Sequence, residues 1–160
     1  MAEGARLESV CAVSPYRGFE SLSLRHIVMQ KALKYLTNKD VIPVWSNVPF
    51  IIPAVIAASK GLFLYAALII IAAAVSYYYH HTDETELKTI DRILAYSVIA
   101  ANLYVLYLAN FRQPYFAIAL MFVAIAFYFF FTGKDHKYDT YHGMWHLSSV
   151  IITLMCVLAY

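Results

Sequence analysis

Five long apolar runs alternate with short polar connections along residues 42–160. Each run holds 17 to 20 residues, and a helix needs roughly that number to cross the ~30 Å hydrocarbon core of a bilayer. The pattern predicts transmembrane helices near 42–59, 62–79, 93–110, 115–131 and 141–160. The sequence therefore predicts an all-α fold, a polytopic membrane helix bundle with about five transmembrane helices.

The first apolar run contains three prolines, Pro43, Pro49 and Pro53. Proline removes a backbone N–H, but a membrane helix tolerates it when neighbouring groups satisfy the freed carbonyls. We therefore expect a kinked first span, with Ser46 and Asn47 about one turn inside its start.

The first 41 residues are more polar and form a predicted N-terminal tail. Within this tail, residues 21–36 mix leucine, isoleucine and valine with arginine and lysine. This pattern is typical of an amphipathic helix lying on the membrane surface, and equally of a soluble helix packed on the loops. Both interpretations remain open.

Composition supports a membrane protein and excludes several other classes. The 160 residues are 62% hydrophobic and 14% charged, with a mean hydropathy of +0.62, which is too apolar for a soluble domain. The formal charge of +2 comes without a basic patch, so we expect no nucleic-acid partner. The two cysteines, Cys11 and Cys156, give neither a disulfide framework nor zinc-finger spacing.

The last apolar run opens with the sequence Tyr-His-Gly-Met-Trp-His, in which His142 and His146 are four residues apart. On a helix this spacing places both imidazoles on one face, one turn apart, where they can bind a single ion. Neutral imidazole is a good zinc ligand, but one helix does not supply a third ligand at this spot. Another segment must provide it.

The number of spans indicates which segment can supply the third metal ligand. Because five spans alternate in direction, the start of the first, the end of the second and the starts of the third and fifth lie at one membrane face. The polar residues at these four ends are Ser46, His80, Asp91, His142 and His146.

The second span ends in two adjacent histidines, and only His80 follows Ser76 by four residues and shares its helical face. His81 points about 100° away and is expected at the rim. Asp91 begins a stripe of inward-facing positions that continues to Asn102. We therefore predict a zinc site of His80, His142 and His146, with Ser76 and Asp91 placed either to act on a water molecule or to hydrogen-bond to the metal ligands. Three protein ligands plus water is the open arrangement of catalytic zinc sites.

Other interpretations of these residues are available. A histidine at the end of a membrane helix is often an interfacial residue or a hydrogen-bond donor between helices. A haem would need histidines on opposing helices, whereas a pair four residues apart on one helix suits a small ion better. Asn102 is expected to form a hydrogen bond between helices rather than to belong to the site. Asp139, three residues before His142, is either a partner that orients His142 or a solvated loop residue.

The same residues resemble the signature of a known group of membrane proteins. The motif Ser-x-x-x-His at 76–80, the aspartate at 91 and the motif His-x-x-x-His at 142–146 are similar to the signature of the CREST superfamily. This group includes alkaline ceramidases, progestin and adipoQ receptors, Per1-type lipid-remodelling factors and the transmembrane-protein-8/myomaker branch. The sequence around residues 46–55, 76–80 and 141–146 looks most similar to the transmembrane-protein-8/myomaker branch.

The resemblance covers roughly residues 42–160. It implies zinc held by His80, His142 and His146, water placed by Ser76 and Asp91, and hydrolysis of an amide or ester bond in a membrane lipid. The family core has seven spans and this chain has five, so about two helices are missing between Asp91 and His142. Because an even number of helices is missing, the metal ligands still lie on one membrane face. A second protomer of a homo-oligomer is a candidate to replace the part of the pocket wall that the two missing helices form in the family. The alternative function is a non-enzymatic membrane receptor or membrane-remodelling protein with a structural zinc site.

Basic residues predict the orientation of the bundle. Ten of the twelve lysines and arginines lie on the side of the histidines, and Lys60 and Arg112 lie on the other side. The positive-inside rule then places the N-terminus and the metal site in the cytoplasm.

Overall fold

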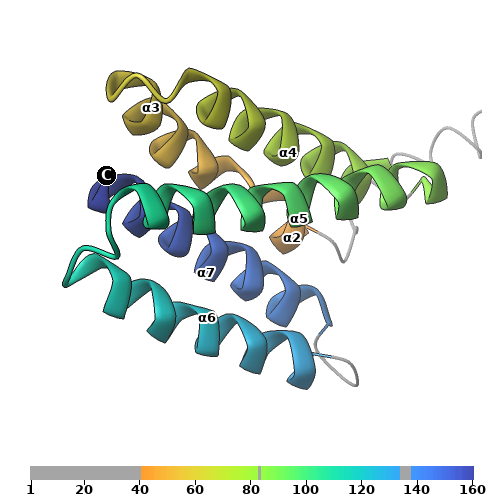
Figure 1. The fold of residues 1–160 in the computed structure, drawn as a ribbon. Coiled ribbons are helices and arrows are strands. Elements are labelled where there is room, and N and C mark those ends of the chain that lie inside the picture. Colours follow the sequence, from red (N-terminus) through yellow and green to blue (C-terminus); the bar gives the residue numbers. More distant parts are fainter. Residues whose placement is uncertain (1–40, 83, 134–137) are drawn as a thin grey trace, which may run out of the picture. The chain divides into compact units, whose positions relative to one another are not determined.

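The computed structural model describes residues 41–82, 84–133 and 138–160. The predicted tail, including the amphipathic segment 21–36, lies outside the described residues. The described part is helical and contains no strand, so the predicted all-α fold is confirmed. Its elements are α2 (Val41–Trp45), the 3-10 helix η1 (Val48–Phe50), α3 (Ile51–Ser59), α4 (Phe63–Thr82), α5 (Thr85–Leu108), α6 (Tyr115–Thr132) and α7 (Tyr138–Ala159) (Figure 1).

Five helical segments are long and apolar enough to cross a membrane, as predicted. They are Ile42–Ser59, Phe63–Thr82, Thr85–Leu108, Tyr115–Thr132 and Tyr138–Ala159. Large apolar side chains such as Leu64, Ile93 and Leu103 are exposed on the outside of the bundle. That distribution suits a lipid environment, which is as apolar as these side chains.

The first span is broken into α2, η1 and α3, which is the form that the predicted kink takes. Pro49 and Pro53 have no N–H to donate to the preceding turn. The chain tightens locally, with Asn47 N–H donating to Val44 O at 3.4 Å and Phe50 N–H donating to Asn47 O at 3.2 Å. This 3-10 geometry interrupts the regular α-helix between α2 and α3.

Two spans begin earlier than the sequence predicted. Helix α5 begins at Thr85 rather than near residue 93, so Asp91 lies inside the helix and not at its mouth. Glu86 in the first turn of α5 interacts favourably with the positive end of the helix dipole, which helps a polar segment to remain helical. Helix α7 begins at Tyr138 rather than at 141.

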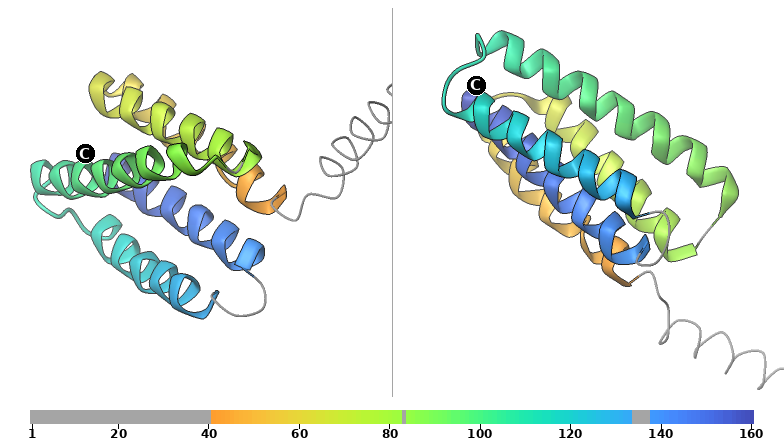
Figure 2. Two further views of the ribbon diagram at one scale, coloured as in Figure 1. Left: turned by 90° about the vertical axis from the view of Figure 1, so that its right-hand side faces the viewer. Right: turned by 90° about the horizontal axis from the view of Figure 1, so that it is seen from below.

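Helix α7 packs against α6, α5, α3 and α2, while α4 packs against α3 and α5. Figures 1 and 2 show α6 beside α7 from different directions, with the C-terminal end of α7 near the turn between α5 and α6. The apolar core lies toward that end and joins small residues such as Ala54, Ala57 and Ala66 to Val105 and Val157. Small side chains let membrane helices approach closely, which favours their association.

Candidate metal centre

Three histidine side chains meet where α4 ends and α7 begins. His142 Nε2 lies 3.1 Å from His80 Nε2 and 3.1 Å from His146 Nε2. One ligand atom from each histidine lies within 4.8 Å of the other two. His80 and His146 are buried and His142 is half-buried. The structure thus brings together the three histidines that the sequence analysis selected as metal ligands.

The adjacent His81 is exposed and lies outside this cluster. Its ring stacks on Tyr77, with the ring centroids 6.2 Å apart. The four-residue spacing between the buried Ser76 and His80 accounts for the difference, because it places these two side chains on the inner face of α4. The helical register of α4 therefore decides which of the two histidines joins the cluster.

The three Nε2 atoms are better placed to bind one cation than to form hydrogen bonds with one another. A neutral imidazole Nε2 carries either one hydrogen or one lone pair. Any hydrogen on His142 Nε2 would have to be shared between two acceptors, while a cation at the common point could bind all three lone pairs. Two nitrogen ligands of a tetrahedral zinc ion lie about 3.3 Å apart, given Zn–N distances of about 2.0–2.1 Å. The two separations from His142 Nε2, each 3.1 Å, are close to this value, and the third pair, His80 and His146, lies within 4.8 Å.

Ser76 and Asp91 form a pair beside the histidines. Ser76 is buried on α4, Asp91 is half-buried on α5, and Ser76 is near enough for its hydroxyl to stabilise the Asp91 carboxylate. Asp91 is not one of the groups whose ligand atoms lie within 4.8 Å of one another. Ser76 lies one helical turn from His80 on α4, and Asp91 is not part of the cluster.

Asn47 is the residue at this site whose contact the sequence did not predict. Its Oδ1 atom lies 2.9 Å from His146 Nδ1, and both side chains are buried. A polar amide inside an apolar run indicates that Asn47 needs a hydrogen-bonding partner. The sequence alone does not show that this partner is His146 on the last span.

Asn102 takes the role that the sequence analysis expected. It accepts a hydrogen bond from the Tyr65 hydroxyl and donates through Nδ2 to Thr153 Oγ1 at 3.2 Å. These contacts join α5 to α4 and α7. They lie away from the histidines and contribute to helix association.

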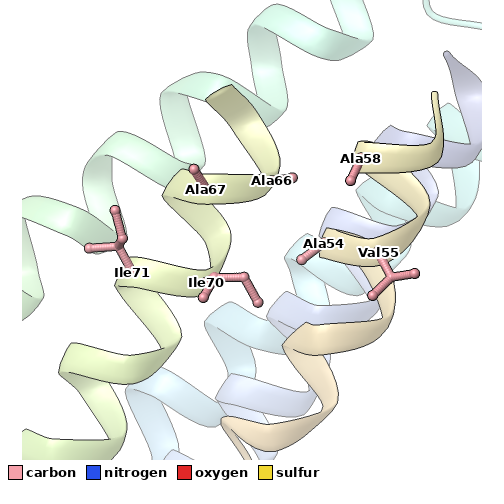
Figure 3. Close-up of a pocket in the computed structure, with 7 residues that line it drawn as sticks. All are labelled: Ala54, Val55, Ala58, Ala66, Ala67, Ile70 and Ile71. Carbon is pink, nitrogen blue, oxygen red and sulfur yellow. The ribbon is translucent and has the colours of Figure 1, made fainter. Parts of the chain in front are cut away.

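A groove lined by apolar side chains opens between α3 and α4 (Figure 3). Its walls are formed within residues 54–58 of α3 and residues 66–71 of α4. The last of these, Ile71, precedes His80 by nine residues, or about 13 Å along a helix. The groove is therefore separate from the histidine cluster.

No family model, curated protein or solved structure matches the chain. Membership of the CREST superfamily consequently stays a prediction from the sequence signature.

Proposed function

We propose that the chain is an integral membrane hydrolase that depends on zinc and cleaves an amide or ester bond of a lipid. The observation that carries this proposal is the convergence of three histidine Nε2 atoms at one end of apolar, membrane-length helices. The Ser76–Asp91 pair beside them supplies groups that can handle a proton.

The ligand set favours catalysis over a purely structural role. Structural zinc sites usually have four protein ligands, whereas catalytic sites have three and leave a position for water or substrate. Among the residues that the structure describes, the cluster contains His80, His142 and His146 and no fourth histidine, cysteine or carboxylate. The alternative, a receptor or remodelling protein with a structural metal, would require a filled set of ligands.

Each polar residue then has a separate task. Zinc, when bound by the three histidines, would polarise the substrate carbonyl and lower the pKa of a water molecule. Asp91 accepts the proton of the attacking water through its carboxylate and passes it to the leaving amine or alcohol as the acyl C–N or C–O bond breaks. Ser76 holds that carboxylate in place through its hydroxyl. The exposed aromatic side chains around this end, including Trp45, Phe131 and Tyr138, suit a substrate that arrives from the bilayer.

The test is the substitution Asp91→Asn in protein purified in detergent. We expect the variant to keep its zinc and to lose about 10²–10⁴-fold in turnover of a fluorescent ceramide or phospholipid, the usual range for a general base. Zinc is measured by elemental analysis and turnover by release of the labelled fatty acid.

The matched control is Glu86→Gln, which removes a carboxylate from an exposed position on the same helix. It should retain both zinc and turnover. Full activity in Asp91→Asn would exclude the base role. A wild type that binds zinc and cleaves neither lipid would favour the structural alternative.

We further propose that the histidine end of the bundle faces the cytoplasm, because ten of the twelve basic residues lie on that side. Single cysteines at position 84 and after Tyr160, in a background lacking Cys11 and Cys156, test this. A membrane-impermeant maleimide added to intact cells should label the cysteine after Tyr160 and spare position 84. The reverse pattern would invert the orientation, and labelling of both from one side would contradict five spans.

A further inference from the structure

The broken first span reaches into the histidine cluster through Asn47. Asn47 Oδ1 and His146 Nδ1 are 2.9 Å apart, and the two residues are only 3% and 8% exposed. His146 has its other ring nitrogen in the cluster, 3.1 Å from His142 Nε2. The His146 imidazole therefore links an amide on the first span to the candidate metal ligands on the second and fifth spans.

The orientation of the Asn47 amide follows from its second contact. Asn47 Nδ2 donates to the backbone carbonyl of Pro43 at 2.9 Å. A carbonyl oxygen can only accept, so the NH₂ group must face Pro43 and Oδ1 must face His146. Since Oδ1 also only accepts, the hydrogen of the neutral imidazole must be on His146 Nδ1. His146 Nε2 is then left with its lone pair directed into the cluster.

The proline-rich sequence makes this carbonyl available. In a regular α-helix, Pro43 O would accept a hydrogen bond from the Asn47 backbone N–H. Here that N–H donates to Val44 O instead, and Pro43 O receives the side chains of Asn47 and Ser46, the latter at 2.8 Å. The break in the helix thus creates the acceptor that orients the amide.

Gly143 allows the first span to come this close. It lies between the two histidines of α7, and a Cβ atom added to it would clash with Ile42 Cγ2 and would touch the Ile42 backbone carbonyl. A larger residue fits in that space only if the Ile42 side chain moves. The glycine inside the His-x-x-x-His motif therefore allows α2, which precedes Asn47, to lie close to α7.

From these contacts we infer that Asn47 is a positioning residue that holds His146 in its Nδ1–H tautomer with Nε2 free for the metal. The effect on zinc affinity rests on the proposed function, whereas the tautomer does not. Hydrogen bonds from the second nitrogen of a ligand histidine fix its tautomer and ring orientation, and their loss typically weakens metal binding about 10–100-fold.

The experiment measures the tautomer directly, in metal-free protein. ¹⁵N-histidine-labelled protein in detergent micelles is examined by NMR, and the His146 signals are assigned from their absence in His146→Gln. In the wild type we expect a protonated Nδ1 and an unprotonated Nε2. In Asn47→Leu the imidazole loses its acceptor, so Nδ1 protonation should no longer be fixed, and zinc affinity should fall about 10–100-fold.

Three further variants separate positioning from general damage. Asn47→Asp keeps an acceptor facing His146 and should retain the Nδ1–H tautomer. Ser46→Ala removes the other donor to Pro43 O without contacting His146, and should leave the tautomer and affinity unchanged. Gly143→Ala leaves Asn47 intact but displaces Ile42, and should reproduce the change seen in Asn47→Leu. This last variant serves as the test if Asn47→Leu does not fold.

An unchanged His146 tautomer in folded Asn47→Leu or Gly143→Ala would overturn the inference. Loss of the Nδ1–H tautomer in Ser46→Ala would also overturn it, because the effect would then not be specific to the amide. A wild type that shows the Nδ1–H tautomer but binds no zinc would remove the proposed function and leave the positioning role of Asn47 in place.

Discussion

Two buried groups of polar side chains both join α4 to α7, but their hydrogen-bonding capacity is met in different ways. The first group is Tyr65, Asn102 and Thr153, in which each group has a complementary partner. The Tyr65 hydroxyl donates to the Asn102 oxygen, and the Asn102 nitrogen donates to the Thr153 hydroxyl. This set is satisfied by protein atoms alone.

The second group, the histidine cluster, brings together the same atom type three times. The His142 Nε2 atom is 3.1 Å from two other Nε2 atoms, and one ring hydrogen does not satisfy both contacts equally. Ionisable groups within membrane spans are costly and usually mark function. The comparison indicates that a mixed set of donors and acceptors joins helices by itself, whereas three neighbouring Nε2 atoms form a cluster that could hold a metal ion.

The two groups also differ in how tightly their surroundings are packed. Tyr65 belongs to the apolar core with Ala54, Ile69 and Val157, so its group lies where helices are most tightly packed. The histidine cluster lies near the start of α7, whereas Thr153 of the first group lies in the second half of this helix, and His142 is half-buried. A small ion or a substrate could reach the second group more easily than the first.

Removing a histidine of the cluster should have the largest effect. We expect His80→Ala, His142→Ala and His146→Ala each to weaken zinc binding by more than about 100-fold, because loss of a ligand should exceed the 10–100-fold cost of losing an outer partner. Lipid turnover should be lost with the metal. Elemental analysis and zinc titration of the purified variants provide the measurement.

His81→Ala is the matched control for this series, since the adjacent His81 is exposed and outside the cluster. It should keep about one zinc per chain, and helix content should survive in all four variants because membrane helices bury their apolar faces without the metal. Zinc retained in His80→Ala but lost in His81→Ala would reverse the assignment. Equal zinc in all four would mean that the histidines do not bind metal.

Much of this site follows from local sequence rules. A spacing of four residues places His142 and His146 on one face of any helix, and the same rule links Ser76 to His80. Five apolar runs that alternate in direction then place the end of the second span and the start of the last span on the same side of the membrane. These predictions succeed because they depend on helix geometry and span number, and not on details of packing.

The rest depends on tertiary contacts that no local pattern contains. The contact of Asn47 with His146 requires the break after α2 and the close approach at Gly143. The start of α5 was misplaced because hydropathy marks where a helix enters lipid, while the helix itself continues through polar residues toward Thr85. Tyr65 is one of 14 tyrosines and has no sequence feature that sets it apart as buried.

The smallest effect is expected at the Tyr65–Asn102–Thr153 group, and it should fall on stability alone. Hydrogen bonds between membrane helices contribute about 0.6 kcal/mol on average and at most about 1.7 kcal/mol. Asn102→Leu removes two such bonds and should lower the free energy of unfolding in detergent by about 1–2 kcal/mol, whereas Thr153→Val removes one and should cost about 0.6 kcal/mol. Zinc content should be unchanged in both variants, because no member of this group contacts the histidines. If Asn102→Leu lost its zinc while remaining folded, the two polar groups would be coupled, and their separation into a structural and a ligand-binding group would be wrong.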